Sequence, residues 1–224
     1  MKRAIVLLSG GLDSATCFLL ARRDAEEVFA LSFDYGQRHR VELERAHALA
    51  ERYGAAAHRI VRLDLPARDA SALTDRSLEV PRDALGREPI PVTYVPARNT
   101  LFLAHAVAWG EAAGAADLYI GANALDYSGY PDCRPEFLEA FERTANLGTK
   151  AGVQGTLWFR IHAPLLRMTK GEIVALAARL GLDFSLTSSC YDPSPEGLPC
   201  GTCDSCLLRA KGFQEAGLFD PIRP

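Results

Sequence analysis

The sequence has little net charge and few lysines, and its first hydrophobic run is short. The 224 residues carry 25 lysines and arginines against 28 acidic residues, a formal net charge of −3, and four of the basic residues are lysine. This balance argues against a strongly basic nucleic-acid-binding protein, and a hydrophobic fraction of 48% argues against a disordered one. The first apolar run stops at Ser9, too early for a signal peptide or a membrane span. We therefore expect a cytoplasmic protein without nucleic-acid or membrane partners.

The sequence also lacks the two common glycine-rich nucleotide motifs. Neither G-x-G-x-x-G nor G-x-x-x-x-G-K-[ST] occurs, which argues against a dinucleotide-dependent enzyme and a Walker-type NTPase. Residues 9–14 (SGGLDS) instead stand between a predicted strand and a predicted helix. Glycines let the backbone approach an anion, serines add hydroxyl donors, and a helix start offers free N–H groups. The loop predicts a phosphate site; the alternative is a glycine turn with Asp13 as the helix N-cap.

Hydrophobic periodicity predicts an α/β fold, with a doubly wound, mostly parallel sheet covered by helices on both faces. Gly54 is expected to end the second helix in a left-handed conformation. Residues 64–97 contain five prolines, so they predict a long excursion such as a lid or dimer arm rather than sheet, and their structure is left open. No internal repeat or low-complexity tract occurs. The expected strands are at residues 3–8, 27–33, 58–63 and 118–121, and the expected helices at 13–23, 39–53 and 99–113.

Two basic residues stand at expected helix starts. Thr169 and Glu172 have the spacing of a capping box, so a helix should begin near Lys170. In a chain that otherwise prefers arginine, a compact ammonium suits a point-charge role beside phosphates. Arg98 opens the helix at 99–113 and can reach a phosphate or a substrate carboxylate. The alternative for both is an ordinary solvated cation in a first helical turn.

Four of the six cysteines crowd into one short segment. The metal-ligand candidates, spaced C-x9-C-x2-C-x2-C, are Cys190, Cys200, Cys203 and Cys206. Four thiolates suit a closed tetrahedral zinc site, although an iron–sulfur cluster also takes four cysteines. The surrounding segment has little apolar content, so the metal is expected to be structural and to order it. Cys17 is expected to pack in the core, and Cys133 to pack rather than to act as a nucleophile.

Taken together, the motifs resemble one family. The SGGLDS loop is similar to the pyrophosphate loop of the ATP pyrophosphatases, the PP-loop superfamily. Residues 33–40 (FDYGQRHR), 95–99 (VPARN), 128–134 (SGYPDCR) and 200–209 (CGTCDSCLLR) narrow the resemblance to the 7-cyano-7-deazaguanine synthase family of queuosine biosynthesis. Ala97 departs from the family pattern, which often has glycine there.

The resemblance implies an adenine nucleotide alpha hydrolase-like fold. It implies a PP-loop ATP pyrophosphatase domain at residues 1–185 and a four-cysteine zinc-binding segment at 186–224. The implied activity is a ligase that converts 7-carboxy-7-deazaguanine and ammonia to the nitrile through an adenylated acid and an adenylated amide, releasing two AMP and two pyrophosphate. The implied cofactors are ATP as co-substrate, Mg²⁺ and one structural Zn²⁺ per chain, and the implied assembly is a homodimer.

Roles for individual residues follow from the loop chemistry and the resemblance. The expected catalytic residues are Ser9, Asp13, Ser14, Arg98 and Lys170. The expected nucleotide-binding residues are Leu8, Ser9, Gly10, Gly11, Leu12, Asp13, Ser14, Ala15, Thr16, Asp34, Tyr35 and Gln37. The expected substrate-binding residues are Asp126, Tyr130, Asp132 and Arg134. Of these, Asp132 with Tyr130 is the candidate for recognition of the base. A carboxylate can accept hydrogen bonds from the amine donors of a deazaguanine ring, and an aromatic side chain can stack on its flat face.

Two other functions fit parts of the sequence. A PP-loop tRNA sulfurtransferase would adenylate a base and deliver sulfur from a cysteine. It would want a basic face and a free pair of reactive thiols, which the acidic balance and the expected metal site disfavour. A non-catalytic, zinc-stabilised nucleotide-binding adaptor would bind ATP without releasing AMP.

Overall fold

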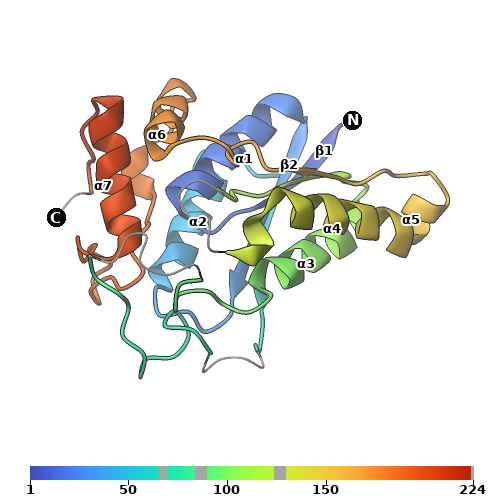
Figure 1. Cartoon of the computed structure of the whole chain (residues 1–224). Helices are drawn as coiled ribbons and strands as arrows, with labels where there is room; N and C mark the ends of the chain where they lie inside the picture. The colour runs from blue at the N-terminus through green and yellow to red at the C-terminus, as the bar shows by residue number, and fades with distance from the viewer. Residues whose placement is uncertain (66–69, 84–89, 124–129, 223–224) are drawn as a thin grey trace.

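A five-stranded parallel sheet forms the centre of the molecule (Figure 1). The computed structural model describes residues 1–65, 70–83, 90–123 and 130–222. The strand order is β3-β2-β1-β4-β5, and every pairing is parallel. The strands are β1 (Arg3–Leu7), β2 (Glu27–Asp34), β3 (Ala57–Arg62), β4 (Asp117–Tyr119) and β5 (Arg160–His162). The predicted doubly wound sheet is confirmed, and β5 is a strand that the sequence analysis did not predict.

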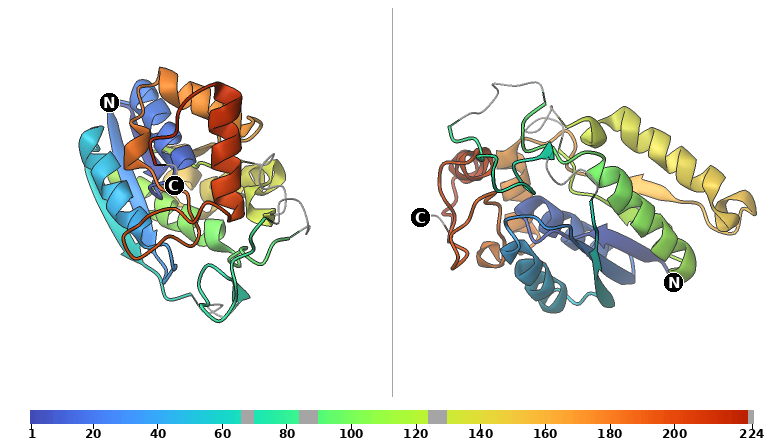
Figure 2. Two further views of the ribbon diagram at one scale, coloured as in Figure 1. Left: turned by 90° about the vertical axis from the view of Figure 1, so that its left-hand side faces the viewer. Right: turned by 90° about the horizontal axis from the view of Figure 1, so that it is seen from below.

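Helices cover both faces of this sheet (Figure 2). Successive side chains of a strand point to opposite faces. On β1, Ala4 and Val6 pack in one apolar layer with α1 (Leu12–Asp24), α2 (Val41–Arg52) and α6 (Lys170–Arg179). Ile5 and Leu7 pack in the other layer with α3 (Arg98–Ala113) and α4 (Pro135–Gly148). Over the described residues, no helix has the length and apolar character needed to cross a membrane. Two further helices are α5 (Lys150–Val153) and α7 (Asp204–Ala216).

The predicted helix signals are largely confirmed, with one exception. Gly54 is left-handed at φ +70°, and Thr169 forms a capping box with Glu172 at the start of α6. The exception is the alternative interpretation of the loop, in which Asp13 is the N-cap of α1: the N-cap is Gly11, and Asp13 lies in the first turn. Helices α4, α5 and α7 were not predicted.

The described part of residues 64–97 runs without regular strands or helices of its own and lies against the cysteine-rich segment. Ala72 and Val80 pack against three of the cysteines, and Arg82 forms an antiparallel bridge with Cys203. The Arg38 guanidinium donates to two backbone oxygens of this stretch, at 2.7 and 2.9 Å. The excursion therefore covers the cysteines.

Candidate active site

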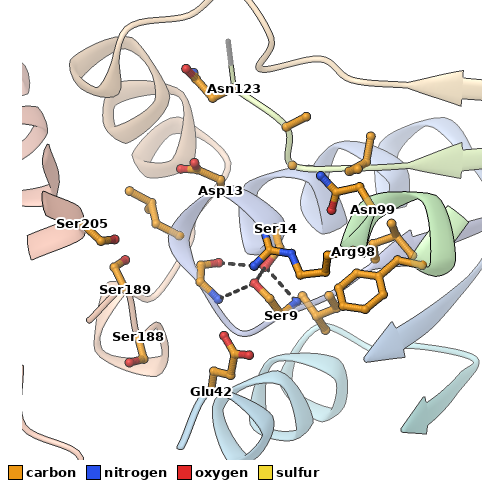
Figure 3. Close-up of a pocket in the computed structure, with 18 of the residues that line it drawn as sticks. Ser9, Asp13, Ser14, Glu42, Arg98, Asn99, Asn123, Ser188, Ser189 and Ser205 are labelled. Carbon is orange, nitrogen blue, oxygen red and sulfur yellow. Dashed lines mark hydrogen bonds between the residues drawn. The ribbon is translucent and has the colours of Figure 1, made fainter. Parts of the chain in front are cut away.

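The SGGLDS loop forms a compact hydrogen-bonded turn at the carboxyl end of β1 (Figure 3). The Ser9 and Ser14 hydroxyls lie 3.1 Å apart, and the Ser9 N–H donates to Ser14 Oγ at 3.2 Å. Ser14 Oγ donates to the Gly11 carbonyl at 3.0 Å, and the Gly11 N–H donates to Ser9 Oγ at 3.3 Å. Both hydroxyls therefore face inward at the start of α1, where the helix dipole favours an anion.

Two glycines allow the close packing of this loop. Gly10 adopts φ +90°, and a Cβ on it would lie 2.2 Å from the Glu42 carbonyl oxygen in α2. A Cβ on Gly121, just after β4, would lie 3.0 Å from the Ser14 backbone nitrogen. The loop is therefore wedged between α2 and the end of β4, at the point where the strand order reverses and where open α/β sheets bind their ligands.

Lys170 reaches the loop from the first turn of α6. Its Nζ lies 2.8 and 3.0 Å from the two carboxylate oxygens of Asp13. Lys170 is 7% exposed, so a full positive charge stands beside the phosphate loop with little water around it. The capping box at Thr169 sets where α6 begins and hence where this lysine points. The structure thus places Lys170 beside the loop, as the sequence predicted.

Arg98 enters the same site at the start of α3. It follows Ala97, which adopts a left-handed conformation at φ 54°, and its Nη1 donates to the Tyr35 hydroxyl at 3.4 Å. Burial opposes its charge, but the surrounding phenols, thiol and carboxylate raise the pKa of Arg98. Burial raises the pKa of Tyr35 to about 12. The guanidinium is thus charged and the phenol is neutral at physiological pH.

Residues 132 and 133 anchor the first turn of α3 by hydrogen bonds. Asp132 Oδ2 accepts from the Asn99 N–H at 2.9 Å, and Asn99 Nδ2 donates to the Asp132 carbonyl at 3.1 Å and to Cys133 Sγ at 3.3 Å. Burial raises the pKa of Cys133 to about 11, so this thiol is protonated. These contacts fix the helix start and therefore the direction of Arg98.

The four clustered cysteines come together next to this site. Their sulfur atoms all lie within 4.8 Å of one another. Cys190 Sγ accepts from the backbone N–H groups of Asp192 and Cys200, at 3.3 and 3.2 Å, and Cys200 Sγ accepts from that of Cys203 at 3.3 Å. Such N–H donors stabilise thiolates, which are the form that binds a metal. The donor set fits a closed four-thiolate centre.

One pocket of about 230 Å³ connects these features. Its floor is the phosphate loop, and Cys190 of the cysteine cluster forms part of its wall. Phe33 and Phe102 add an aromatic side, with ring centroids 3.9 Å apart. The pocket therefore offers a phosphate cradle, the cations Lys170 and Arg98 and an apolar surface.

Comparison with known proteins identifies the family. The family model described as queuosine biosynthesis protein QueC matches residues 3–217. The chain belongs to this family. A 7-cyano-7-deazaguanine synthase from Geotalea daltonii is 59% identical over 221 residues, which cover 99% of this chain and 96% of the relative. Another of that name, from Anaeromyxobacter sp., is 60% identical over 223 residues, covering 98% and 95%. The resemblance seen in the motifs is confirmed.

A solved structure shows the same fold in a distant protein. The predicted subunit of tRNA methyltransferase from Methanocaldococcus jannaschii matches with a TM-score of 0.50 and 16% identity, covering 80% of this chain and 75% of that one. At this identity the likeness shows a shared fold alone.

The structure of this QueC-family chain brings half of the predicted site residues into one pocket. The predicted residues that line it are Leu8, Ser9, Gly11, Leu12, Asp13, Ser14, Tyr35, Arg98, Tyr130, Lys170 and Cys190. Those that lie away from the lining are Gly10, Ala15, Thr16, Asp34, Gln37, Asp132, Arg134, Cys200, Cys203 and Cys206. Asp132 is buried in its contacts with α3, and Arg134 is exposed at the N-terminus of α4. Asp126 lies outside the described residues.

The sequence analysis missed several polar residues of the pocket. They are Ser32, His39, Glu42, Asn123, Ser188, Ser189, Ser205 and Arg209. Asn123 follows β4 at the carboxyl edge of the sheet, a position that could have marked it. Nothing in the sequence around Ser188 and Ser189 marks them as pocket residues. Their place depends on a contact between distant segments, in which the Ser188 N–H donates to the Gly10 carbonyl at 2.9 Å.

Arg209 holds this serine segment in place. Its guanidinium forms a two-pronged pair with Asp220, at 2.7 and 2.9 Å, and Nη1 donates to Thr187 Oγ1 at 2.8 Å. Both partners of the ion pair are buried. Helix α7 is thereby tied to the segment at 187–189 that forms one wall of the pocket.

Proposed function

We propose that this chain is an ATP-dependent carbon–nitrogen ligase that converts 7-carboxy-7-deazaguanine and ammonia to 7-cyano-7-deazaguanine. The observation that carries the proposal is the arrangement of the SGGLDS loop, Lys170 and Arg98 around one pocket, in a chain 59% identical to a synthase of that name. The same arrangement supports cleavage of ATP to AMP and pyrophosphate.

The residues divide the chemistry between them. A carboxylate is a poor electrophile, so one of its oxygens must first be transferred to AMP. The charge that develops on the departing pyrophosphate would be met by the backbone N–H groups and hydroxyls of Ser9 and Ser14 and by the Lys170 ammonium. Ammonia then displaces AMP to give an amide. A second adenylation of the amide oxygen, followed by loss of AMP, leaves the nitrile.

Substrate contacts are assigned within the same proposal. Tyr130 lines the pocket, and its hydroxyl lies 2.8 Å from Thr93 Oγ1, which holds the ring in one orientation. Arg98 would bind the substrate carboxylate or the α-phosphate. Asp132 supports Arg98 through the first turn of α3 instead of touching the substrate. Roles for Asp126 and Arg134 stay predictions.

Two metal ions complete the proposal. Mg²⁺ would accompany the nucleotide phosphates, with Asp13 as the loop carboxylate nearest to them. The four clustered cysteines would hold one Zn²⁺, which supplies order and, with four protein ligands, has no open position for catalysis. The homodimer, the cytoplasmic location and the division at residues 185 and 186 stay predictions.

The experiment that tests this function measures products directly. Purified protein is incubated with ATP, Mg²⁺, an ammonium salt and 7-carboxy-7-deazaguanine, and AMP and the nitrile are followed by mass spectrometry. We expect both products to appear together, and a large loss of both in Ser9→Ala. Ser77→Ala, at an exposed serine outside the pocket, is the matched control. If wild-type protein releases no more AMP than Ser9→Ala, the assignment is wrong.

A further inference from the structure

The proposed reaction has a requirement that the phosphate loop and its cations do not meet. The nitrogen enters as ammonia, with three hydrogens, and leaves in a nitrile, with none. One N–H proton is lost when ammonia displaces AMP, and two more are lost while the amide becomes the nitrile. A group in the pocket must therefore accept protons repeatedly, and a cation cannot do so.

Most ionisable groups of the pocket are unable to accept a proton at neutral pH. Burial raises the pKa of Tyr35 to about 12 and that of Cys133 to about 11, and it also raises the pKa of Tyr130. These groups are already protonated. Among the described residues that line the pocket, two carry carboxylates, Asp13 and Glu42, and Asp13 is paired with the Lys170 ammonium. Glu42, which lies beside His39, is therefore the remaining candidate for the proton acceptor.

Glu42 and His39 form a pair on the α2 side of the pocket (Figure 3 shows Glu42 below the loop). Glu42 Oε2 lies 3.4 Å from His39 Nε2, and both side chains are largely buried, with exposed fractions of 13% and 8%. Gln37 Nε2 donates to Glu42 Oε1 at 2.9 Å, and Gln37 is itself held by the Phe33 carbonyl and the Tyr35 N–H. His39 Nδ1 is buried without a hydrogen-bond partner in the described structure.

The pair also shares its pocket with the phosphate loop. Glu42 and His39 both line the pocket that Ser9 lines. A carboxylate held at one oxygen by a neutral amide keeps lone pairs for a proton, and an imidazole beside it can pass that proton on. This arrangement is typical of a general base.

We propose that Glu42, with His39, is the proton acceptor for the ammonia-derived nitrogen, an inference that rests on the proposed function. In the first stage the nitrogen lone pair forms the C–N bond, the C–O bond to AMP breaks with its electrons leaving on AMP, and an N–H proton passes to the pair and then to solvent. In the second stage the amide oxygen attacks the α-phosphorus of ATP and pyrophosphate leaves as one N–H proton is lost. Loss of the last proton and of AMP then forms the C≡N bond.

Glu42→Gln tests this proposal, since it removes the acceptor and keeps the size of the side chain. Glu44→Gln, at an exposed position of the same helix, is the matched control. Three readouts are compared in the full chain: acid-dependent exchange of pyrophosphate into ATP, formation of amide and nitrile from ammonia, and formation of a hydroxamic acid from hydroxylamine. Exchange reports activation of the acid, which needs no base. Hydroxylamine also loses one N–H proton when it displaces AMP, but it is a much stronger nucleophile than ammonia, so water can serve as its proton acceptor and it depends less on a base in the pocket.

The expected result is a selective loss. Glu42→Gln should lower turnover with ammonia about 100-fold or more, while exchange and hydroxamate formation stay near wild type. His39→Asn should show the same pattern with a smaller loss. Wild-type nitrile formation in Glu42→Gln overturns the proposal, and so does an equal loss of all three readouts, which would indicate a role in nucleotide binding or folding. If the wild-type protein itself shows neither exchange nor nitrile, it is the proposed function that fails.

Discussion

The phosphate loop and Cys190 of the four-cysteine cluster line the same pocket, yet the loop and the cluster differ in the packing around them. The loop follows β1, whose residues Ala4, Ile5 and Val6 are fully buried between two helical layers. The cysteine cluster has a small apolar neighbourhood in which Ala72 and Val80 are the other buried members. The packing of β1 positions the loop, and hydrogen bonds shape it, whereas the cluster has little apolar packing of its own.

This difference has a consequence for energetics. Burying one large aliphatic side chain contributes about 1.5–3 kcal/mol, and the layers around β1 contain many of them. Zinc binding to four-ligand sites in peptides contributes about 10–16 kcal/mol, which exceeds what two small apolar residues can supply. We therefore expect a single substitution in the loop to leave the fold intact. Loss of one cysteine, in contrast, should disorder the whole cluster.

The largest expected effect is the loss of one cluster cysteine. Cys203→Ser removes a fully buried thiol, and we expect the zinc to be lost together with the wall formed by residues 188–190. Metal analysis and thermal unfolding check this: zinc should fall from one per chain to near zero, with a large fall in unfolding temperature. Cys133→Ser, which changes a cysteine outside the cluster, should keep its zinc. A Cys203→Ser protein that retains one zinc and unfolds like wild type would show that packing holds this region too.

The next largest effect is a loss of turnover when Lys170, beside the loop, is replaced, with the fold kept intact. Lys170→Met removes the buried ammonium beside Asp13, so turnover should fall about 100- to 1,000-fold, the usual cost of losing one stabilising group for a developing anion. Steady-state kinetics measure this. Lys211→Met, at an exposed lysine of α7, is the matched control and should leave turnover unchanged. Equal kinetics for both variants would remove Lys170 from the proposed mechanism.

The loop was predictable from the sequence because its determinants are local. The buried run of β1, the SGGLDS turn and the capping box at Thr169 each act over a few residues, and each was found where expected. Lys170 could be placed near the phosphates because its position follows from where α6 starts.

The opposite wall of the pocket was not predictable, because it is assembled from distant segments. Ser188 reaches Gly10 through a hydrogen bond, and Glu42 is oriented by Gln37, which itself turns back to β2. Asp132, which was predicted to contact the substrate, lies away from the pocket lining and accepts a hydrogen bond at the start of α3, and a sequence does not distinguish a carboxylate in such a contact from one that binds a ligand. Pairings of this kind depend on the tertiary fold.

A smaller effect tests the backbone before Arg98. Ala97 is left-handed at φ 54°, which costs a non-glycine residue about 1–2 kcal/mol, while glycine adds back about 0.5–1 kcal/mol of unfolded-state entropy. Ala97→Gly should therefore raise the free energy of unfolding by up to about 1 kcal/mol, measured by denaturant unfolding. Ala104→Gly, at an exposed position inside α3, should lower it by about the same amount. A lower free energy of unfolding in Ala97→Gly would mean that the left-handed conformation of Ala97 is not strained.

The smallest expected effect separates the single thiols from the clustered ones. Cys133 borders the pocket, but burial raises its pKa to about 11, so the reactive thiolate is scarce near neutral pH and grows only as pH rises toward that value. Alkylation of Cys133 by iodoacetamide, followed by mass spectrometry, should be slow at pH 7 and faster at high pH. Replacing it together with the fully buried Cys17, as Cys17→Ala with Cys133→Ser, should leave nitrile formation close to wild type. Fast alkylation at pH 7 with complete loss of turnover in the double variant would instead support transfer of sulfur from a cysteine, and the two cysteines outside the cluster would then have a chemical role.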